Sequence, residues 1–233
     1  MKNEEVMPAH FSFFILHSSF FTPMTRAIIF DFDGVILDSV DIKTRAFARL
    51  FEEHGPEVSR QVVEHHLAHG GVSRFRKFAH IYEHILHRPM PEGESERLGE
   101  KFSALVFDEV TKAAWIPGAP EFLQQHHGRW LFFIASGTPQ EELERIVRLR
   151  DLEKYFTGVF GSPATKEQIT RRIFEEHGLQ PHEVVFIGDA MTDFNAAKAC
   201  GVGFVGIAAA EGNPFPAGTR VLPELRQLGS VLG

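Results

Sequence analysis

The chain alternates short apolar runs with longer segments in which apolar residues recur every three or four positions. Strands are predicted where the apolar runs lie, at 27–30, 131–135, 159–161, 184–187 and 204–207. Short continuous apolar runs are typical of strands buried on both faces. Apolar residues spaced every three or four positions are typical of amphipathic helices. Strands that alternate with helices predict a parallel sheet with helices on both faces.

The predicted helices fall into two groups. Those that alternate with strands are expected at 120–126, 140–150, 167–177, 193–200 and 223–228. Four others follow one another without a strand between them, at 41–54, 59–69, 73–87 and 94–110. We therefore expect an α/β fold, a Rossmann-like doubly wound parallel sheet formed by 24–37 and 116–233, with an inserted helical cap at 38–115.

Composition narrows the class of protein. The 233 residues are 43% hydrophobic and 24% charged, with a formal net charge of −7. This balance suits a globular domain and disfavours a nucleic-acid-binding protein, which would present a broad basic face. No run approaches the ~20 apolar residues of a membrane span. The single cysteine, Cys200, fits a reducing compartment, so we expect a cytoplasmic protein.

The first 23 residues fit none of the predicted elements. Residues 11–21 read FSFFILHSSFF, but they lack the basic start and small-residue cleavage site of a secretory signal. Met24 stands directly before the first predicted strand. We therefore predict that Met24 is the native start and that residues 1–23 are an extension, which mass spectrometry of the native protein would test.

Polar residues gather where the predicted strands end. Those that follow a strand or open a neighbouring helix are Asp31, Asp33, Ser136, Gly137, Lys166, Asp189 and Asp193. In a parallel sheet the carboxyl ends of the strands meet at one edge, where ligands bind. Clustered carboxylates repel one another and favour a cation, and oxygen ligands favour Mg²⁺. A metal beside a lysine and a hydroxyl is suited to holding a phosphoryl group.

These residues form four motifs in a familiar order. DFDGVILDS at 31–39, the strand end at Ser136, Lys166 and GDAMTD at 188–193 resemble the four motifs of the haloacid dehalogenase superfamily. The resemblance extends from Met24 to the C-terminus and is greatest to the phosphoglycolate phosphatase-like and β-phosphoglucomutase-like branch with a helical cap. One departure is Val35, where the family often has threonine. The resemblance implies a Mg²⁺-dependent phosphatase acting on a small phosphorylated metabolite.

The resemblance also assigns roles to the acidic residues. Asp31 would be the nucleophile that forms an aspartyl-phosphate, and Asp33 the acid that protonates the leaving oxygen and then the base that activates water. The metal would be bound by the carboxylates of Asp31 and Asp189 and by the backbone carbonyl of Asp33. Asp193 would support the metal or position Lys166.

The remaining roles concern the phosphate and the leaving group. Ser136 and the Gly137 N–H would hold phosphoryl oxygens, and Lys166 would pair with the nucleophile and the phosphate. The cap would close over the site and select the leaving group. Its segment 70–77 places two glycines before a basic helix start, so we expect Arg74 or Lys77 to touch the substrate.

Several alternatives stay open at this stage. A sugar-phosphate mutase would use the same residues, and a phosphonate hydrolase would need a cap lysine such as Lys43. A catalytically inactive binding or regulatory protein on this fold is the alternative of a different class. The protein is expected to be a monomer or a homodimer. Two further motifs, GVGFVG at 201–206 and HIYEH at 80–84, match nucleotide-binding and zinc-peptidase patterns out of their required context.

Overall fold

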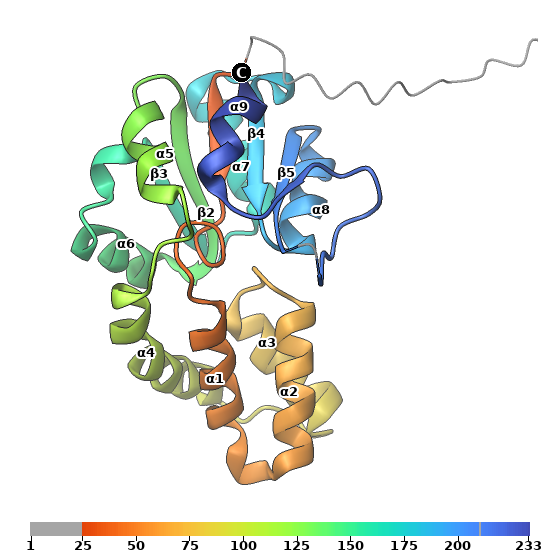
Figure 1. Ribbon diagram of the computed structural model, residues 1–233. Coiled ribbons are helices and arrows are strands. Elements are labelled where there is room, and N and C mark those ends of the chain that lie inside the picture. The colour runs from red at the N-terminus through yellow and green to blue at the C-terminus, as the bar shows by residue number, and fades with distance from the viewer. Residues whose placement is uncertain (1–24, 210) are drawn as a thin grey trace, which may run out of the picture.

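A computed structural model describes residues 25–209 and 211–233 (Figure 1). The predictions made for residues 1–23 and for the start at Met24 lie outside this range. No helix in the described part of the chain combines the length and apolar character needed to cross a membrane. The expected cytoplasmic location stays a prediction.

The described strands form one parallel sheet, which confirms the predicted α/β fold class. They are β1 (Ala27–Phe30), β2 (Leu131–Pro139), β3 (Gly158–Ser162), β4 (Val184–Gly188), β5 (Gly203–Ile207) and β6 (Val221–Leu222). Their order is β3-β2-β1-β4-β5-β6, and every neighbouring pair is parallel. β6 is absent from the sequence prediction because two residues are too short to show a period.

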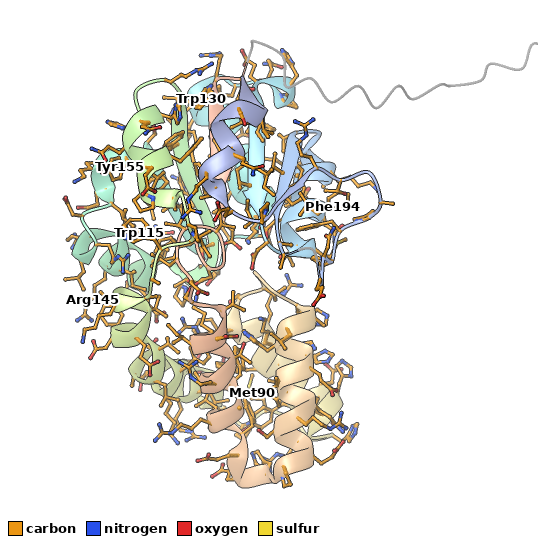
Figure 2. The ribbon with its side chains drawn as sticks, viewed as in Figure 1. Met90, Trp115, Trp130, Arg145, Tyr155 and Phe194 are labelled. Atoms are coloured by element: carbon orange, nitrogen blue, oxygen red, sulfur yellow. The ribbon has the colours of Figure 1, made fainter. Side chains whose placement is uncertain are left out.

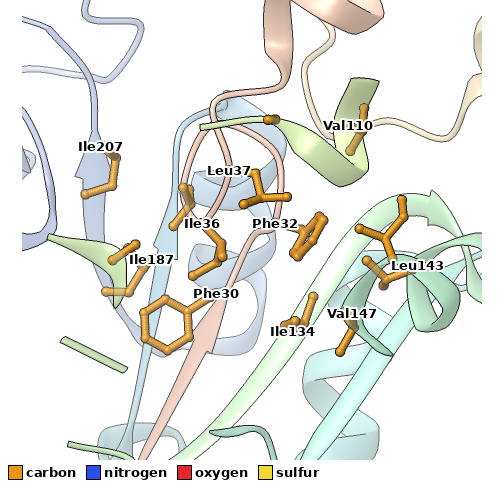
Figure 3. Packing of buried hydrophobic residues seen from close by; sticks show 14 of the residues in the cluster. Phe30, Phe32, Ile36, Leu37, Val110, Ile134, Leu143, Val147, Ile187 and Ile207 are labelled. Carbon is orange, nitrogen blue, oxygen red and sulfur yellow. The ribbon is translucent and has the colours of Figure 1, made fainter. Parts of the chain in front are cut away.

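Both faces of the sheet are buried, as the continuous apolar runs predict. In β1 the side chains of Ile28 and Phe30 join one apolar cluster, and those of Ala27 and Ile29 join another. Figure 3 shows the first cluster, in which Phe30 lies among residues of the neighbouring strands and helices. The helices that cover this face are α5 (Ala119–His126), α6 (Gln140–Leu149) and α9 (Leu228–Leu232). The opposite face is covered by α7 (Lys166–His177) and α8 (Met191–Cys200).

The helices between β1 and α5 lie beyond the carboxyl end of the sheet (Figure 1). They are α1 (Val40–Leu50), α2 (Pro56–Ala68), α3 (Arg74–His80) and α4 (Glu94–Lys112), with short 3₁₀ and π segments at Glu52–His54 and Ile81–Ile85. Four buried phenylalanines, Phe47, Phe51, Phe78 and Phe102, fill the space between them. The chain passes between sheet and helices twice, where Leu37 pairs with Trp115, which is labelled in Figure 2.

Several helix boundaries differ from the predicted ones, and three cases have a clear physical reason or consequence. α2 begins at Pro56 rather than at residue 59, because proline is well suited to the first turn of a helix. The helix expected at 73–87 passes from α3 into the π-helix Ile81–Ile85. The helix expected at 223–228 is wrong: a 3₁₀ turn at Leu225–Gln227 precedes α9, and the backbone N–H of Leu225 donates to the Pro117 carbonyl instead.

Candidate active site

Asp31 lies at the centre of the carboxyl edge of the sheet. It follows β1 directly, is 2% exposed, and donates its backbone N–H to the Ile187 carbonyl of β4 at 2.8 Å. Its Oδ1 accepts the Phe32 N–H and its Oδ2 accepts Lys166 Nζ, both at 2.6 Å. Burial raises the pKa of Asp31, and the Lys166 ammonium opposes that shift. Asp31 is therefore a desolvated carboxyl group with a fixed cationic partner.

Asp33 has a separate set of partners, most of them from the cap side. Its Oδ1 accepts Ser39 Oγ at 2.6 Å, and its Oδ2 accepts Lys43 Nζ and, at 3.2 Å, Thr138 Oγ1. Burial opposes ionisation of Asp33, but the Lys43 ammonium and these hydrogen bonds outweigh it and lower its pKa. In this arrangement Asp33 is ionised, which is the form that accepts a proton.

Lys166 joins two carboxylates. It is the first residue of α7, whose N-cap Thr165 accepts the Gln168 N–H. Its ammonium donates to Asp31 and to Asp193, which is 0% exposed and also accepts the Ala190 N–H at 3.1 Å. Burial would lower the pKa of Lys166, but the two carboxylates raise it above its ordinary value. Lys166 is thus held as an ammonium, with Asp193 as its second carboxylate partner.

Asp189 follows β4 and completes the acidic cluster. Oxygens of Asp31, Asp189 and Asp193 lie within 4.8 Å of one another. Within the described residues no hydrogen-bond donor or cation pairs with the Asp189 carboxylate. Burial, and then the neighbouring carboxylates, raise the pKa of Asp189 well above its ordinary value. The single ammonium of Lys166 pairs with Asp31 and Asp193 but not with Asp189. Three carboxyl groups therefore lie beside one cation, an arrangement that fits a divalent metal ion.

The backbone around this cluster depends on two glycines. Gly34 has φ +76°, and a Cβ there would lie 2.2 Å from Asp189 Oδ2, so only glycine allows the loop after β1 to approach this carboxylate. In the cap, Gly71 has φ +72°, and a Cβ there would lie 2.6 Å from Lys166 Nζ. Thr192 Oγ1 donates to the Gly70 carbonyl at 2.5 Å. The loop between α2 and α3 therefore rests on the acidic cluster.

Ser136 and Gly137 lie beside this loop at the end of β2. Ser136 is 1% exposed, and its Oγ accepts the Thr138 N–H at 3.1 Å. A Cβ on Gly137 would lie 2.4 Å from the Gly71 carbonyl oxygen, so backbone of the sheet and backbone of the cap meet here. The structure thus brings every residue predicted from the strand ends to one edge.

A cavity of about 210 Å³ opens next to the cluster, between the sheet edge and the cap. Its polar lining includes Asp33 and Asp189 from the core and Lys43, His66, Arg74 and Lys77 from the cap. A cavity that joins carboxylates of the sheet edge to basic side chains of a separate helical layer is suited to a small anionic ligand.

The model of the haloacid dehalogenase-like hydrolase family matches residues 28–207. The chain belongs to this family. A phosphorylated carbohydrates phosphatase of Thermotoga maritima is 31% identical over 184 residues, which cover 76% of this chain and 82% of that protein. Phosphoglycolate phosphatase 1 of Pseudomonas aeruginosa is 25% identical and covers 78% of this chain and 69% of its own length. These relatives confirm the resemblance seen in the motifs.

Solved structures agree with this assignment at the level of the fold. A β-phosphoglucomutase from Clostridium difficile has a TM-score of 0.72 at 20% identity, covering 88% of this chain and 93% of that one. A phosphoglycolate phosphatase, so named by prediction, from Haemophilus somnus has a TM-score of 0.70 at 15% identity, covering 90% and 99%. The haloacid dehalogenase-like architecture is therefore shared well beyond sequence similarity.

The two cap cations expected near the substrate differ in their surroundings. Arg74 donates to both carboxylate oxygens of Glu142 and to Ser103 Oγ, and its guanidinium lies 4.4 Å from the centre of the Phe102 ring. These contacts tie the cap to α6. Arg74 is therefore already neutralised by a protein carboxylate.

Lys77, in contrast, has no carboxylate partner in the described part of the chain. It is 3% exposed, with Nζ 2.9 Å from His66 Nδ1, 3.2 Å from the His66 carbonyl oxygen and 5.4 Å from the centre of the Phe47 ring. Burial, followed by the nearby Lys43 ammonium, lowers its pKa to about 7. Lys77 is a desolvated amine on the wall of the cavity.

Sequence reasoning did not predict a role for three residues that the structure places at this site. Ser39, Thr138 and Thr192 contact Asp33 or the cap loop, and Lys43 was considered only as a Schiff-base lysine. One signal was available: Ser39 and Lys43 are four residues apart at the start of a helix that follows the Asp33 loop, which puts both on one face. Thr138 and Thr192 had no such local signal.

Proposed function

We propose that this chain is a Mg²⁺-dependent phosphatase that hydrolyses a small-molecule phosphate monoester through an aspartyl-phosphate on Asp31. The observation that supports this most is the geometry at Asp31: a buried carboxyl group, 2.6 Å from the Lys166 ammonium, at the edge where Asp33 and Asp189 also lie. Such a group can attack phosphorus while neighbouring cations neutralise the phosphoryl oxygens.

In the first step a carboxylate oxygen of Asp31 bonds to phosphorus as the bond from phosphorus to the leaving oxygen breaks. The leaving oxygen takes a proton from the carboxylic acid of Asp33. In the structure Lys43 holds Asp33 ionised. For the acid step, Lys43 would have to move away from Asp33 when substrate binds, and Asp33 would have to take up a proton from solvent before it gives that proton to the leaving oxygen.

In the second step a water oxygen bonds to phosphorus and the bond from phosphorus to Asp31 breaks. Asp33, now a carboxylate, takes the proton from that water, and inorganic phosphate leaves. Return of Lys43 to Asp33 would favour this ionised form. Ser136 and the Gly137 N–H would hold the phosphoryl oxygens, and Lys166, kept charged by Asp193, would neutralise one of them.

The residues present fit Mg²⁺. The carboxylates of Asp31 and Asp189 and the backbone carbonyl of Asp33 would hold it, and hard oxygen ligands are those that this ion prefers. The Asp189 carboxylate has no protein partner within the described residues, which supports its assignment as a ligand. When bound, the ion supplies positive charge that neutralises phosphoryl oxygens and the nucleophile.

The cap helices, residues 38–115, would select the leaving group. Of the two cations expected to touch the substrate, Lys77 is the better candidate, because Arg74 is paired with Glu142. A carboxylate or hydroxyl oxygen on the leaving group would supply the partner that Lys77 lacks. The names of the phosphorylated carbohydrates and phosphoglycolate phosphatases are consistent with small phosphorylated substrates.

An assay with an aryl phosphate tests the proposal. We expect activity that requires Mg²⁺ and falls at least about a thousandfold in Asp31→Asn. Asp108→Asn, an exposed carboxylate on α4, is the matched control and should keep full activity. After an acid quench, a radiolabelled substrate should leave phosphate on the wild-type chain and none on Asp31→Asn. Full activity in Asp31→Asn would overturn the mechanism.

The same assay separates the two alternatives that use this fold. A sugar-phosphate mutase would transfer the phosphoryl group to a sugar phosphate and release little inorganic phosphate. An inactive binding protein would give neither product while still binding ligand. Release of inorganic phosphate at the same rate as the alcohol product identifies a phosphatase.

A further inference from the structure

An ion pair between Arg74 and Glu142 joins the cap to the core at the wall of the cavity. Arg74 is the first residue of α3 and lines the cavity, whereas Glu142 lies in the first turn of α6. Arg74 Nη1 lies 3.0 Å from Glu142 Oε2, and Arg74 Nη2 donates to Oε1. Ser103 Oγ of α4 accepts from Arg74 Nη1 at 2.8 Å and donates to Glu142 Oε2. Donors from the cap therefore occupy both oxygens of Glu142.

Burial makes this partner difficult to exchange. The side chain of Arg74 is 5% exposed and that of Glu142 is 9% exposed. A buried charge that loses its partner strongly destabilises the protein around it. A ligand anion that took Arg74 would leave the Glu142 carboxylate desolvated and without its counter-charge. The first turn of a helix also favours a negative charge, which keeps Glu142 in its ionised form beside Arg74.

The other cations of the cavity are placed differently. Lys43 pairs with Asp33, and the Lys77 amine contacts His66. Among the described lysine and arginine side chains that line this cavity, Lys77 alone has no carboxylate partner. A leaving group in the cavity therefore meets one basic group that no protein carboxylate neutralises.

We propose that Glu142 is a specificity-determining residue: by holding Arg74, it excludes leaving groups that carry a second phosphate. A carboxylate or a hydroxyl group can be matched by Lys77 alone. A second phosphate carries about two negative charges near neutral pH and needs a second cation. Arg74 is the cation on the cavity wall that could serve it, and the Glu142 carboxylate already neutralises that guanidinium. The favoured substrates are thus monophosphates whose leaving group bears at most one negative charge.

This exclusion bears on the choice between a phosphatase and a sugar-phosphate mutase, and it rests on the proposed function. In a mutase the oxygen of a sugar hydroxyl bonds to phosphorus while the bond from phosphorus to Asp31 breaks, and the hydroxyl proton passes to Asp33. The product is a sugar bisphosphate, whose second phosphate must be held in the cavity. Because Glu142 keeps Arg74 from that phosphate, water is favoured over a sugar phosphate as the acceptor.

Binding of phosphonates tests the role of Glu142 without catalysis. Short α,ω-alkane bisphosphonates and the alkylphosphonates of the same chain length are titrated calorimetrically in excess Mg²⁺, since their carbon–phosphorus bonds are not phosphate ester bonds. The measured quantity is the ratio of the two affinities. In Glu142→Gln this ratio should move at least ~10-fold toward the bisphosphonate, the effect of one hydrogen bond to a charged group. Glu141→Gln, an exposed neighbour on α6, is the matched control and should keep the wild-type ratio.

A double variant keeps the test independent of how well Glu142→Gln folds. Arg74→Met/Glu142→Gln removes both charges and should keep the wild-type ratio, because Arg74 does not serve the ligand in wild type. An unchanged ratio in Glu142→Gln, or a ratio in the double variant that falls tenfold against the bisphosphonate, would overturn the proposal. Loss of phosphatase activity toward every phosphate monoester tested would instead overturn the proposed function and would leave these affinity ratios as they are.

Discussion

Lys77→Met should change how the stability of the protein depends on pH. Methionine keeps the length and unbranched shape of the side chain but removes the amine. Burial lowers the pKa of Lys77 from 10.5 to about 7. The charged groups around it that contribute to its pKa are Asp33, Lys43, Lys166 and Asp189, with His66 in direct contact.

The size of the effect follows from proton linkage. Between pH 7 and pH 10.5 the unfolded chain holds about one proton more at Lys77 than the folded protein does. The free energy of unfolding therefore rises with pH, by about 1.4 kcal/mol per pH unit in this window. Between about pH 7.5 and 9 this amounts to ~2 kcal/mol. Lys77→Met has no such group and should lack this rise.

Urea unfolding of wild type and Lys77→Met at the two pH values measures the difference, in the presence of Mg²⁺ and without substrate. For each protein the change in the free energy of unfolding between the two pH values is taken. The loss of the contact with His66 lowers the stability of Lys77→Met at both pH values and therefore cancels. Lys101→Met, an exposed lysine on α4, is the control and should keep the wild-type pH dependence. If Lys77→Met kept it too, Lys77 would be fully charged in the folded protein and the reasoning would be refuted.

The same substitution should weaken catalysis on the physiological substrate. If the Lys77 ammonium binds the leaving group, kcat/KM should fall at least about tenfold, mainly through KM, because a charge-assisted hydrogen bond is lost. Activity on an aryl phosphate with an apolar leaving group should change little. An equal loss on both substrates would indicate a general structural role for Lys77.

Other predictions concern the acidic cluster. Lys43→Met should raise the pKa of Asp33, which a shift of the corresponding limb of the kcat/KM pH profile to higher pH would reveal; an unchanged profile would contradict the role of Lys43. Gly34→Ala should abolish Mg²⁺-dependent activity, since its Cβ would lie 2.2 Å from Asp189 Oδ2 at φ +76°, and an active variant would show that the loop can shift. Without Mg²⁺, stability should fall as pH rises above the ordinary aspartate range, because the pKa of Asp189 is raised in the fold. Mg²⁺ should remove that fall in thermal melts, and its persistence would argue against a metal at Asp189.

Sequence reasoning was strongest where neighbours in the chain decide the structure. The strand β1 and the place of Asp31 after it follow from the AIIF run and from the parallel alternation, both local patterns. The predicted helix end at residue 200 agrees with the structure, in which Gly201 is the left-handed C-cap of α8. The first glycine of the GVGFVG motif therefore ends a helix. The predicted helix at 223–228 failed because a distant partner intervened: Pro117 accepts the backbone N–H of Leu225.

The sequence by itself determined the α/β fold class and the collection of carboxylates at one sheet edge, because strand periodicity and strand direction are properties of short segments. Only the tertiary structure decided which cation serves which carboxylate. Arg74 of the cap, for example, meets Glu142 of α6 across 68 residues. Such pairs depend on how the cap packs against the sheet, and among the described residues that packing leaves Lys77 on the cavity wall without a carboxylate partner.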